Sequence, residues 1–217
     1  MIKAVIFDMD GLIVDTEIIQ SKALEQLLKN YGKKPLPYPN GLIHIPGEAG
    51  KASYKRLQEL YHLTDTPEVL RRKTHIIFRK LLEKKLIALP GFFTLITMVD
   101  KNNFKRAVAS SRFIDHIHLI LENLDVKKYF DVIIGPDKNR RNKPHPDIFL
   151  DTANQLGVNP ENCLVLEDSE IGIVAAHAAG MKVIAVPNEY TKAHNFSKAD
   201  KVVNSLESVT MELINSL

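Results

Sequence analysis

The feature that most constrains the fold is a series of five short, continuous apolar runs spread along the chain. Runs of this length are typical of parallel strands that are covered on both faces. Helical patterns lie between several of them, and two of these patterns end on Gly157 and Gly180. Strands that alternate with helices predict an α/β fold with a doubly wound, Rossmann-like parallel sheet. The apolar runs are 4–7, 107–109, 132–134, 163–166 and 183–186, and the helical patterns are 113–124, 146–157 and 169–180.

Residues 15–88 interrupt this alternation. They contain no strand-like run, and their patterns predict helices at 17–31, 49–61 and 67–85. Residues 15–85 carry 14 basic and 8 acidic side chains, a net charge of +6, which leaves −3 for the remainder of a chain whose total is +3. We therefore predict a Rossmann-like core of residues 1–14 and 89–217, with an all-helical domain, 15–88, inserted after the first strand.

Composition excludes several classes of protein. The single cysteine, Cys163, rules out an internal disulfide, and apolar runs of four to five residues are far shorter than the ~18 residues of a membrane-spanning helix. The N-terminal segment does not have the pattern of a signal peptide, because its apolar run stops at Asp8. A net charge of +3 is too small to indicate nucleic-acid binding. We expect a cytoplasmic globular protein with no membrane or nucleic-acid partner.

An acidic pair, Asp8 and Asp10, follows the first apolar run directly and precedes Gly11. Carboxylates two positions apart project to the same side of an extended backbone. At the carboxyl end of a parallel strand they would stand where such sheets bind ligands. They also repel each other unless a cation or a shared proton compensates. The alternative is a surface turn that caps the next helix.

Three further polar motifs follow other predicted strands. Ser110 and Ser111 come at a helix entrance, where hydroxyl and backbone N–H groups can bind phosphate, although a serine there is also an ordinary helix cap. Lys143 stands before two prolines and could neutralise a carboxylate–phosphate pair, or be a solvated charge. Glu167 and Asp168 offer the oxygen ligands that Mg²⁺ requires, and the alternative is that Ser169 or Asp168 merely caps the following helix. Because each motif ends a different strand, we expect all of them in one crevice.

With these motifs in order, the chain resembles the haloacid dehalogenase superfamily over essentially its whole length. The similarity is strongest to the branch with a helical cap after the first motif, which holds small-molecule phosphatases and β-phosphoglucomutase-like proteins. Residues 7–17 look like the first motif and hinge of that family. Ser110 resembles its second motif and Lys143 its third, while residues 167–169 with Gly172 resemble its fourth.

The resemblance implies a role for each matching residue. Asp8 would be the nucleophile, Asp10 the general acid/base, and Ser110 and Lys143 the phosphate ligands. Mg²⁺ would be the cofactor, held by Asp8, the main-chain carbonyl of Asp10, and Asp168 helped by Glu167. The presence of Asp10, Glu167 and Asp168 argues against a dehalogenase, which needs neither a metal nor an acid for the leaving group.

Substrate contacts are predicted at three further residues: Ser111 next to the second motif, and Lys51 and Lys73 in the cap. Loops near the two lysine positions contact substrate in similar proteins, and the alternative is that both lie on solvated helix faces. A basic cap suits an anionic substrate. We therefore predict a monomeric, Mg²⁺-dependent phosphatase that hydrolyses a small phosphorylated metabolite through an aspartyl-phosphate.

Two other functions remain open at this point. The first is a β-phosphoglucomutase-like phosphomutase. Two departures weaken it: Gln20 stands where mutase-like members often carry histidine, and residues 46–51 lack a clear match for the arginine that grips the second phosphate. The second is a binding or regulatory protein that has lost catalysis, which the intact motifs disfavour.

Overall fold

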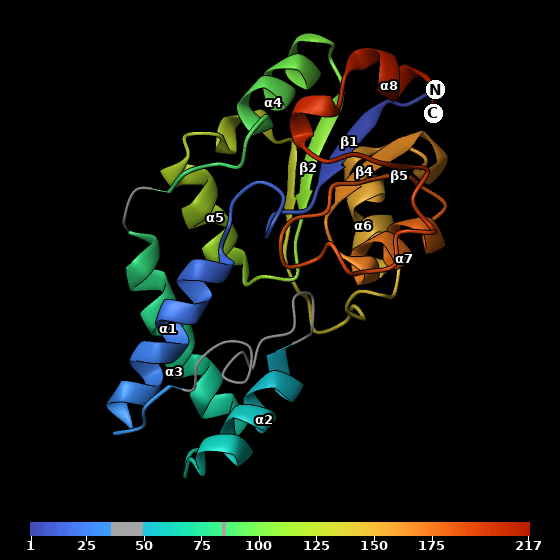
Figure 1. Cartoon of the computed structure of the whole chain (residues 1–217). Coiled ribbons are helices and arrows are strands. Elements are labelled where there is room, and N and C mark those ends of the chain that lie inside the picture. The colour runs from blue at the N-terminus through green and yellow to red at the C-terminus, as the bar shows by residue number, and fades with distance from the viewer. Residues whose placement is uncertain (36–49, 84–85) are drawn as a thin grey trace. The chain divides into compact units, whose positions relative to one another are not determined.

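The computed structural model describes residues 1–35, 50–83 and 86–217, the side chains of residues 50–52 excepted. The chain divides into two compact units (Figure 1). One, the sheet unit, consists of residues 1–15 and 86–217; the other, the helical unit, consists of residues 16–85. Within the described residues, no helix combines the length and apolar character needed to cross a membrane.

A six-stranded parallel sheet in the order β3-β2-β1-β4-β5-β6 forms the sheet unit. The predicted α/β fold is confirmed, and each of the five apolar runs contributes a strand. Sequence patterns missed β6, which is only two residues long, exposed, and without an apolar run. The strands are β1 (Ala4–Phe7), β2 (Lys105–Ala109), β3 (Val132–Ile134), β4 (Cys163–Glu167), β5 (Lys182–Ala185) and β6 (Lys201–Val202).

Helices join these strands and end near the predicted residues. The predicted helix 146–157 begins one residue later, since Pro146 is its N-cap, and it ends at Gly157 in the left-handed conformation (φ +67°) that glycine adopts without strain. The helices of the sheet unit are α4 (Phe92–Lys101), α5 (Ile114–Asn123), α6 (Asp147–Leu156), α7 (Glu170–Ala178) and α8 (Met211–Asn215).

Side chains on the two faces of β1 pack into different layers. Ala4 and Ile6 belong to the apolar cluster that includes residues of α6 and α7. Phe7 points to the opposite face, where its ring meets the ring of Phe92 on α4 edge-on at 6.0 Å. The sheet is therefore covered on both faces, and its polar groups are confined to the strand ends. In Figure 1, β1, β2, β4 and β5 lie side by side.

Three helices, α1 (Glu17–Asn30), α2 (Gly50–Tyr61) and α3 (Pro67–Leu82), make up the described elements of the helical unit. Thr66 is the N-cap of α3, and its hydroxyl accepts a hydrogen bond from the Val69 N–H. The unit has its own apolar core, composed of Leu27, Leu28, Tyr54, Leu57, Tyr61, Leu63 and Leu70. The action of this unit as a cap stays a prediction.

The paired phenylalanines at the start of α4 test this account of the core. Phe92 is fully buried, whereas Phe93 is 52% exposed. We expect Phe92→Ala to lower the free energy of unfolding by about 3–5 kcal/mol, because it removes a buried ring and leaves a cavity. Phe93→Ala, the matched control, should cost less than about 1 kcal/mol. Chemical denaturation of both variants measures the difference, and equal losses would contradict the packing described.

Candidate active site

The predicted residues meet at the carboxyl ends of three neighbouring strands. Phe7 pairs with Val108 of β2 and with Leu166 of β4, so the residues that follow these strands lie next to one another. Asp8 follows β1, while Glu167 ends β4 and Asp168 comes directly after it. All three carboxylates are buried. The sheet register therefore assembles residues that are more than 150 positions apart in the sequence.

Lys143 occupies the centre of this cluster. Its ammonium group donates hydrogen bonds to Asp8 Oδ1 and to Glu167 Oε1, both at 2.6 Å. It also lies 4.9 Å from the ring centroid of Phe149, a distance at which a cation is attracted to an aromatic face. Its side chain is only 3% exposed. Lys143 is therefore a buried, charge-paired residue and not a solvated one.

Glu167 is fixed by the start of α7 as well as by Lys143. Its Oε2 accepts hydrogen bonds from the backbone N–H and the hydroxyl of Ser169, both at 2.9 Å. The Ser169 hydroxyl in turn accepts from the Gly172 N–H and so caps the helix. A side chain at Gly172 would overlap the Glu167 carboxylate, which explains glycine at that position. Ser169, and not Asp168, is the capping residue.

Burial changes the proton affinity of the cluster. Burial and the nearby Glu167 and Asp10 raise the pKa of Asp8 to about 7, although Lys143 acts against them. Burial and the nearby Glu167 and Asp8 also raise the pKa of Asp168, although Lys143 and the hydrogen bond from Asn188 act against them. Burial by itself would lower the pKa of Lys143, but Asp8 and Glu167 outweigh it and hold that pKa above its ordinary value.

The donor set fits a hard divalent cation. Asp8, Glu167 and Asp168 each offer a carboxylate oxygen, and these oxygens lie within 4.8 Å of one another. Lys143 pairs with two of these carboxylates, Asp8 and Glu167, and Asp168 adds a third, so the ionised cluster has an excess of buried negative charge. Oxygen ligands and uncompensated negative charge are what Mg²⁺ binds. The residues present therefore suit the predicted metal.

Arg112 is a site residue that the sequence reasoning missed. Its Nε donates to Asp10 Oδ1 at 2.7 Å, and the Ser110 hydroxyl donates to Asp10 Oδ2 at 3.3 Å. The same hydroxyl accepts from the Arg112 N–H, so Ser110 does not cap α5. Arg112 stands two residues after the second motif, but no charge pattern in the sequence connects it to Asp10.

Asn188 is a second missed residue. It follows β5 and donates through its side-chain amide to Asp168 Oδ2 at 2.7 Å. An isolated asparagine after a strand has the pattern of an ordinary turn, so the sequence alone gives no signal for this contact.

The three predicted substrate contacts have different surroundings. Ser111 lines a pocket together with Lys143 and part of the loop before it. Lys73 lies in the helical unit, where its ammonium donates to Tyr31 and Asp65 at 2.8 and 2.7 Å. Lys51 is in the backbone of α2, but its side chain falls outside the described residues. Their roles in substrate binding stay predictions.

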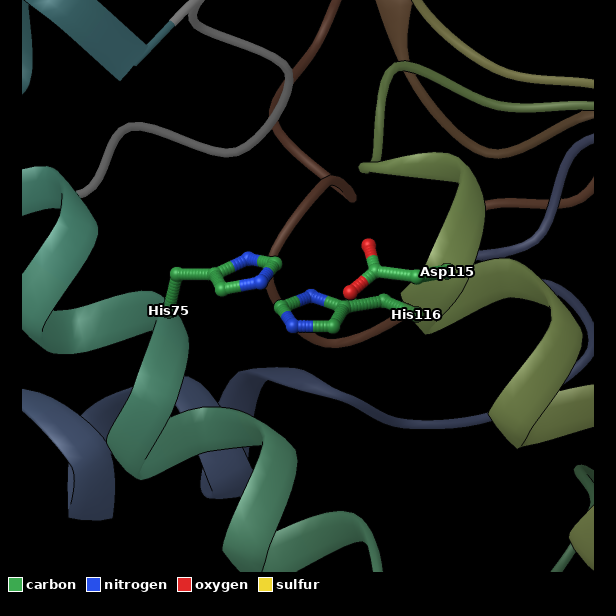
Figure 2. Close-up of side chains that lie close together, drawn as sticks. All are labelled: His75, Asp115 and His116. Carbon is green, nitrogen blue, oxygen red and sulfur yellow. The ribbon is translucent and has the colours of Figure 1, made fainter.

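Figure 2 labels three more side chains with metal-binding atoms. Asp115 and His116 project from the first turn of α5 in the sheet unit, and His75 projects from α3 in the helical unit (Figure 2). A metal site needs ligands that are fixed relative to one another. Because these three come from separate units, we assign no site to them.

Comparisons of the sequence with known proteins all lead to one family. The profile of the haloacid dehalogenase-like hydrolases matches residues 5–186. A phosphorylated carbohydrates phosphatase of Thermotoga maritima is 33% identical over 183 residues, which cover 84% of this chain and 83% of that protein. The bifunctional riboflavin kinase/FMN phosphatase of Arabidopsis thaliana is 32% identical over 209 residues. That match covers 96% of this chain but 54% of the plant protein, so the chain spans about half of that relative's length.

Solved structures agree with this assignment. The crystal structure of β-phosphoglucomutase from Clostridium difficile superposes with a TM-score of 0.82 at 31% sequence identity. The match covers all of this chain and 96% of the other. The order of the strands and the inserted helices are thus those of a known architecture.

The raised pKa of Asp8 predicts how stability depends on pH. A carboxyl whose pKa rises on folding, here from 3.8 to about 7, binds more protons in the folded chain, so the free energy of unfolding falls as pH rises through that range. Without metal, Asp8→Asn should therefore raise the Tm at pH 8 by a few degrees, since ~1 kcal/mol shifts a domain of this size by roughly 2–4 °C. At pH 4 it should change little.

Thermal melts in a chelator from pH 4 to 8 measure this effect. Asp125→Asn is the matched control, because the Asp125 side chain is 87% exposed and pairs only at the surface with Lys128 among the described ion pairs. A gain at pH 8 that the control shares, or a loss for Asp8→Asn that is the same at every pH, would contradict the electrostatic explanation.

Proposed function

The chain belongs to the haloacid dehalogenase-like hydrolase family, and on that premise we propose that it is a Mg²⁺-dependent phosphatase of small phosphate monoesters. The observation that carries the proposal is the buried contact between Lys143 and Asp8, which holds a carboxylate nucleophile beside a cation. An anionic nucleophile can approach an anionic phosphate only where positive charge offsets the repulsion. Lys143 supplies part of that charge at the nucleophile itself.

In the first step the Asp8 carboxylate attacks phosphorus. The bond from phosphorus to the substrate oxygen breaks, and an aspartyl-phosphate forms on Asp8. Asp10, which must be neutral at this step, gives its proton to the departing oxygen, which leaves as an alcohol, and Asp10 becomes a carboxylate. Arg112 and Ser110 hold the Asp10 carboxylate at both of its oxygens, so its orientation is set before substrate arrives.

In the second step a water molecule attacks the aspartyl-phosphate. Asp10 takes a proton from this water, the bond between phosphorus and Asp8 breaks, and inorganic phosphate leaves. Asp8 is then a free carboxylate again, and Asp10 a neutral carboxyl. Because the phosphoryl group is held on Asp8 between the two steps, one difficult displacement is replaced by two easier ones.

The residues proposed to hold Mg²⁺ are Asp8, Asp168 and the main-chain carbonyl of Asp10, with Glu167 in support. The ion, when bound, neutralises charge on the transferring phosphoryl group. Glu167 has both oxygens engaged by Lys143 and Ser169, so its part is to orient the lysine and to add negative charge.

The proposed substrate class is a phosphorylated carbohydrate or a similar small metabolite, acted on by a cytoplasmic monomer. The similarity to the Thermotoga maritima phosphorylated carbohydrates phosphatase supports this class. The net charge of +6 on residues 15–85 suits an anionic ligand. Lys51 and Lys73 are the proposed contacts of the helical unit, with Ser111 next to the phosphate.

A phosphomutase is the second candidate. The 31% identity with the Clostridium difficile β-phosphoglucomutase over the whole chain favours it. Two departures weigh against it. Gln20 stands where mutase-like members often carry histidine, and residues 46–51 contain no arginine to grip the second phosphate that a mutase must hold. Of these positions, 46–49 lie outside the described residues.

Phosphate release from a panel of phosphorylated carbohydrates tests the phosphatase. We expect turnover that a chelator abolishes and added Mg²⁺ restores. Asp8→Asn should lower kcat by at least about a thousandfold, because a neutral amide is a poor nucleophile. Asp125→Asn serves again as the surface control and should keep full activity. Unchanged turnover in Asp8→Asn would rule out the covalent mechanism.

Phosphorus NMR with β-glucose 1-phosphate separates the two candidates. A phosphatase converts this substrate to inorganic phosphate, whereas a mutase converts it to glucose 6-phosphate. We expect inorganic phosphate as the main product, since water reaches the aspartyl-phosphate where no second phosphate is gripped. Accumulation of glucose 6-phosphate would decide for the mutase.

A further inference from the structure

Asn188 connects the carboxyl ends of three strands. It follows β5, Asp168 follows β4, and Gly11 belongs to the turn after β1. The Asn188 side-chain nitrogen donates to Asp168 Oδ2 at 2.7 Å and to the Gly11 carbonyl at 3.1 Å. One amide group thus bridges the predicted metal ligand Asp168 and the loop that carries Asp10.

The orientation of this amide is determined by its partners. The Asn188 Oδ1 accepts hydrogen bonds from the backbone N–H groups of Tyr190 and Thr191, at 2.8 and 3.2 Å. Rotating the amide by half a turn would place its oxygen against two other oxygens and its nitrogen against two N–H donors. Only the observed orientation satisfies all four contacts.

Gly11 gives independent evidence that the turn after β1 lies against Asn188 and Asp168. Gly11 has φ +77°, and a Cβ at this position would overlap both the Asn188 nitrogen and the Asp168 carboxylate. The turn after β1 therefore packs directly onto the bonded pair. A side chain at residue 11 and the hydrogen bond from Asn188 to Asp168 exclude each other.

We propose that Asn188 is a positioning residue that fixes the Asp168 carboxylate for a divalent cation. The inference rests on the proposed function, since it concerns the metal of the same site. A carboxylate held through one oxygen keeps a defined direction for cation binding, and loss of such supporting contacts typically weakens metal affinity 10–100-fold. Asn188 acts on the ligand and touches neither substrate nor the reacting atoms.

Two substitutions remove the contact in different ways. Asn188→Ala deletes the whole amide. Asn188→Ser keeps a hydroxyl that can accept from the turn N–H groups but is too short to bridge Asp168 and Gly11. Thr191→Val is the matched control: Thr191 is buried, and its hydroxyl accepts from the Asn188 backbone N–H at 3.0 Å. This control weakens the same turn and leaves the amide on Asp168.

The measurement is the rise in Tm on titration with MgCl₂ alone, which yields an apparent Kd without requiring turnover. We expect Kd to rise at least about tenfold in Asn188→Ser and Asn188→Ala. Thr191→Val should lower the Tm but keep the wild-type Kd. If Asn188→Ala fails to fold, Asn188→Ser carries the comparison.

Each other outcome has a definite meaning. Wild-type Mg²⁺ affinity in Asn188→Ser, in a protein that hydrolyses phosphate esters, overturns the inference and leaves the proposed function standing. An equal loss of affinity in Thr191→Val also overturns it, because the turn and not the amide would then matter. A wild-type protein that Mg²⁺ does not stabilise overturns the inference together with the metal-dependent function.

Discussion

The structure of the site depends on buried negative charge that the protein's own cations neutralise only in part. Lys143 is shared by Asp8 and Glu167, and Asp168 adds a third carboxylate to the same buried group. Taking charges out of water costs several kcal/mol per ion, and pairing returns this only in part. A cluster with this excess of negative charge does not serve stability well. It is, however, well suited to bind a divalent cation and a phosphoryl group.

The parallel sheet makes this concentration of charge possible. Strand interiors are apolar on both faces, as the Phe7 ring against Phe92 illustrates, so polar groups are confined to the strand ends. In a parallel sheet all carboxyl ends lie at one edge, and the register of β1 with β2 and β4 brings their next residues together. Two glycines, Gly11 and Gly172, then leave room for carboxylates to approach the backbone.

The residues that support the site do not belong to any of the sequence motifs. Arg112 and Asn188 each bind a carboxylate of an acidic pair, the first at Asp10 and the second at Asp168. Each therefore fixes the orientation of a carboxylate that the sequence motifs had already identified. Lys73 differs from these two residues. The basic composition of residues 15–85 drew attention to it, but composition did not predict its hydrogen bonds to Tyr31 and Asp65 within the helical unit.

The sequence alone determined the α/β class, the position of the helical insertion and the identity of the acidic, serine and lysine motifs. These are local properties, since apolar runs and the polar residues that end them are contiguous in the chain. Tertiary structure alone decided which residues support the motifs. Arg112 and Asn188 contact partners 102 and 20 positions away, and single residues of common types leave no pattern at such distances. The two-residue strand β6 escaped prediction for a related reason: it is formed by pairing with β5 and not by its own side chains.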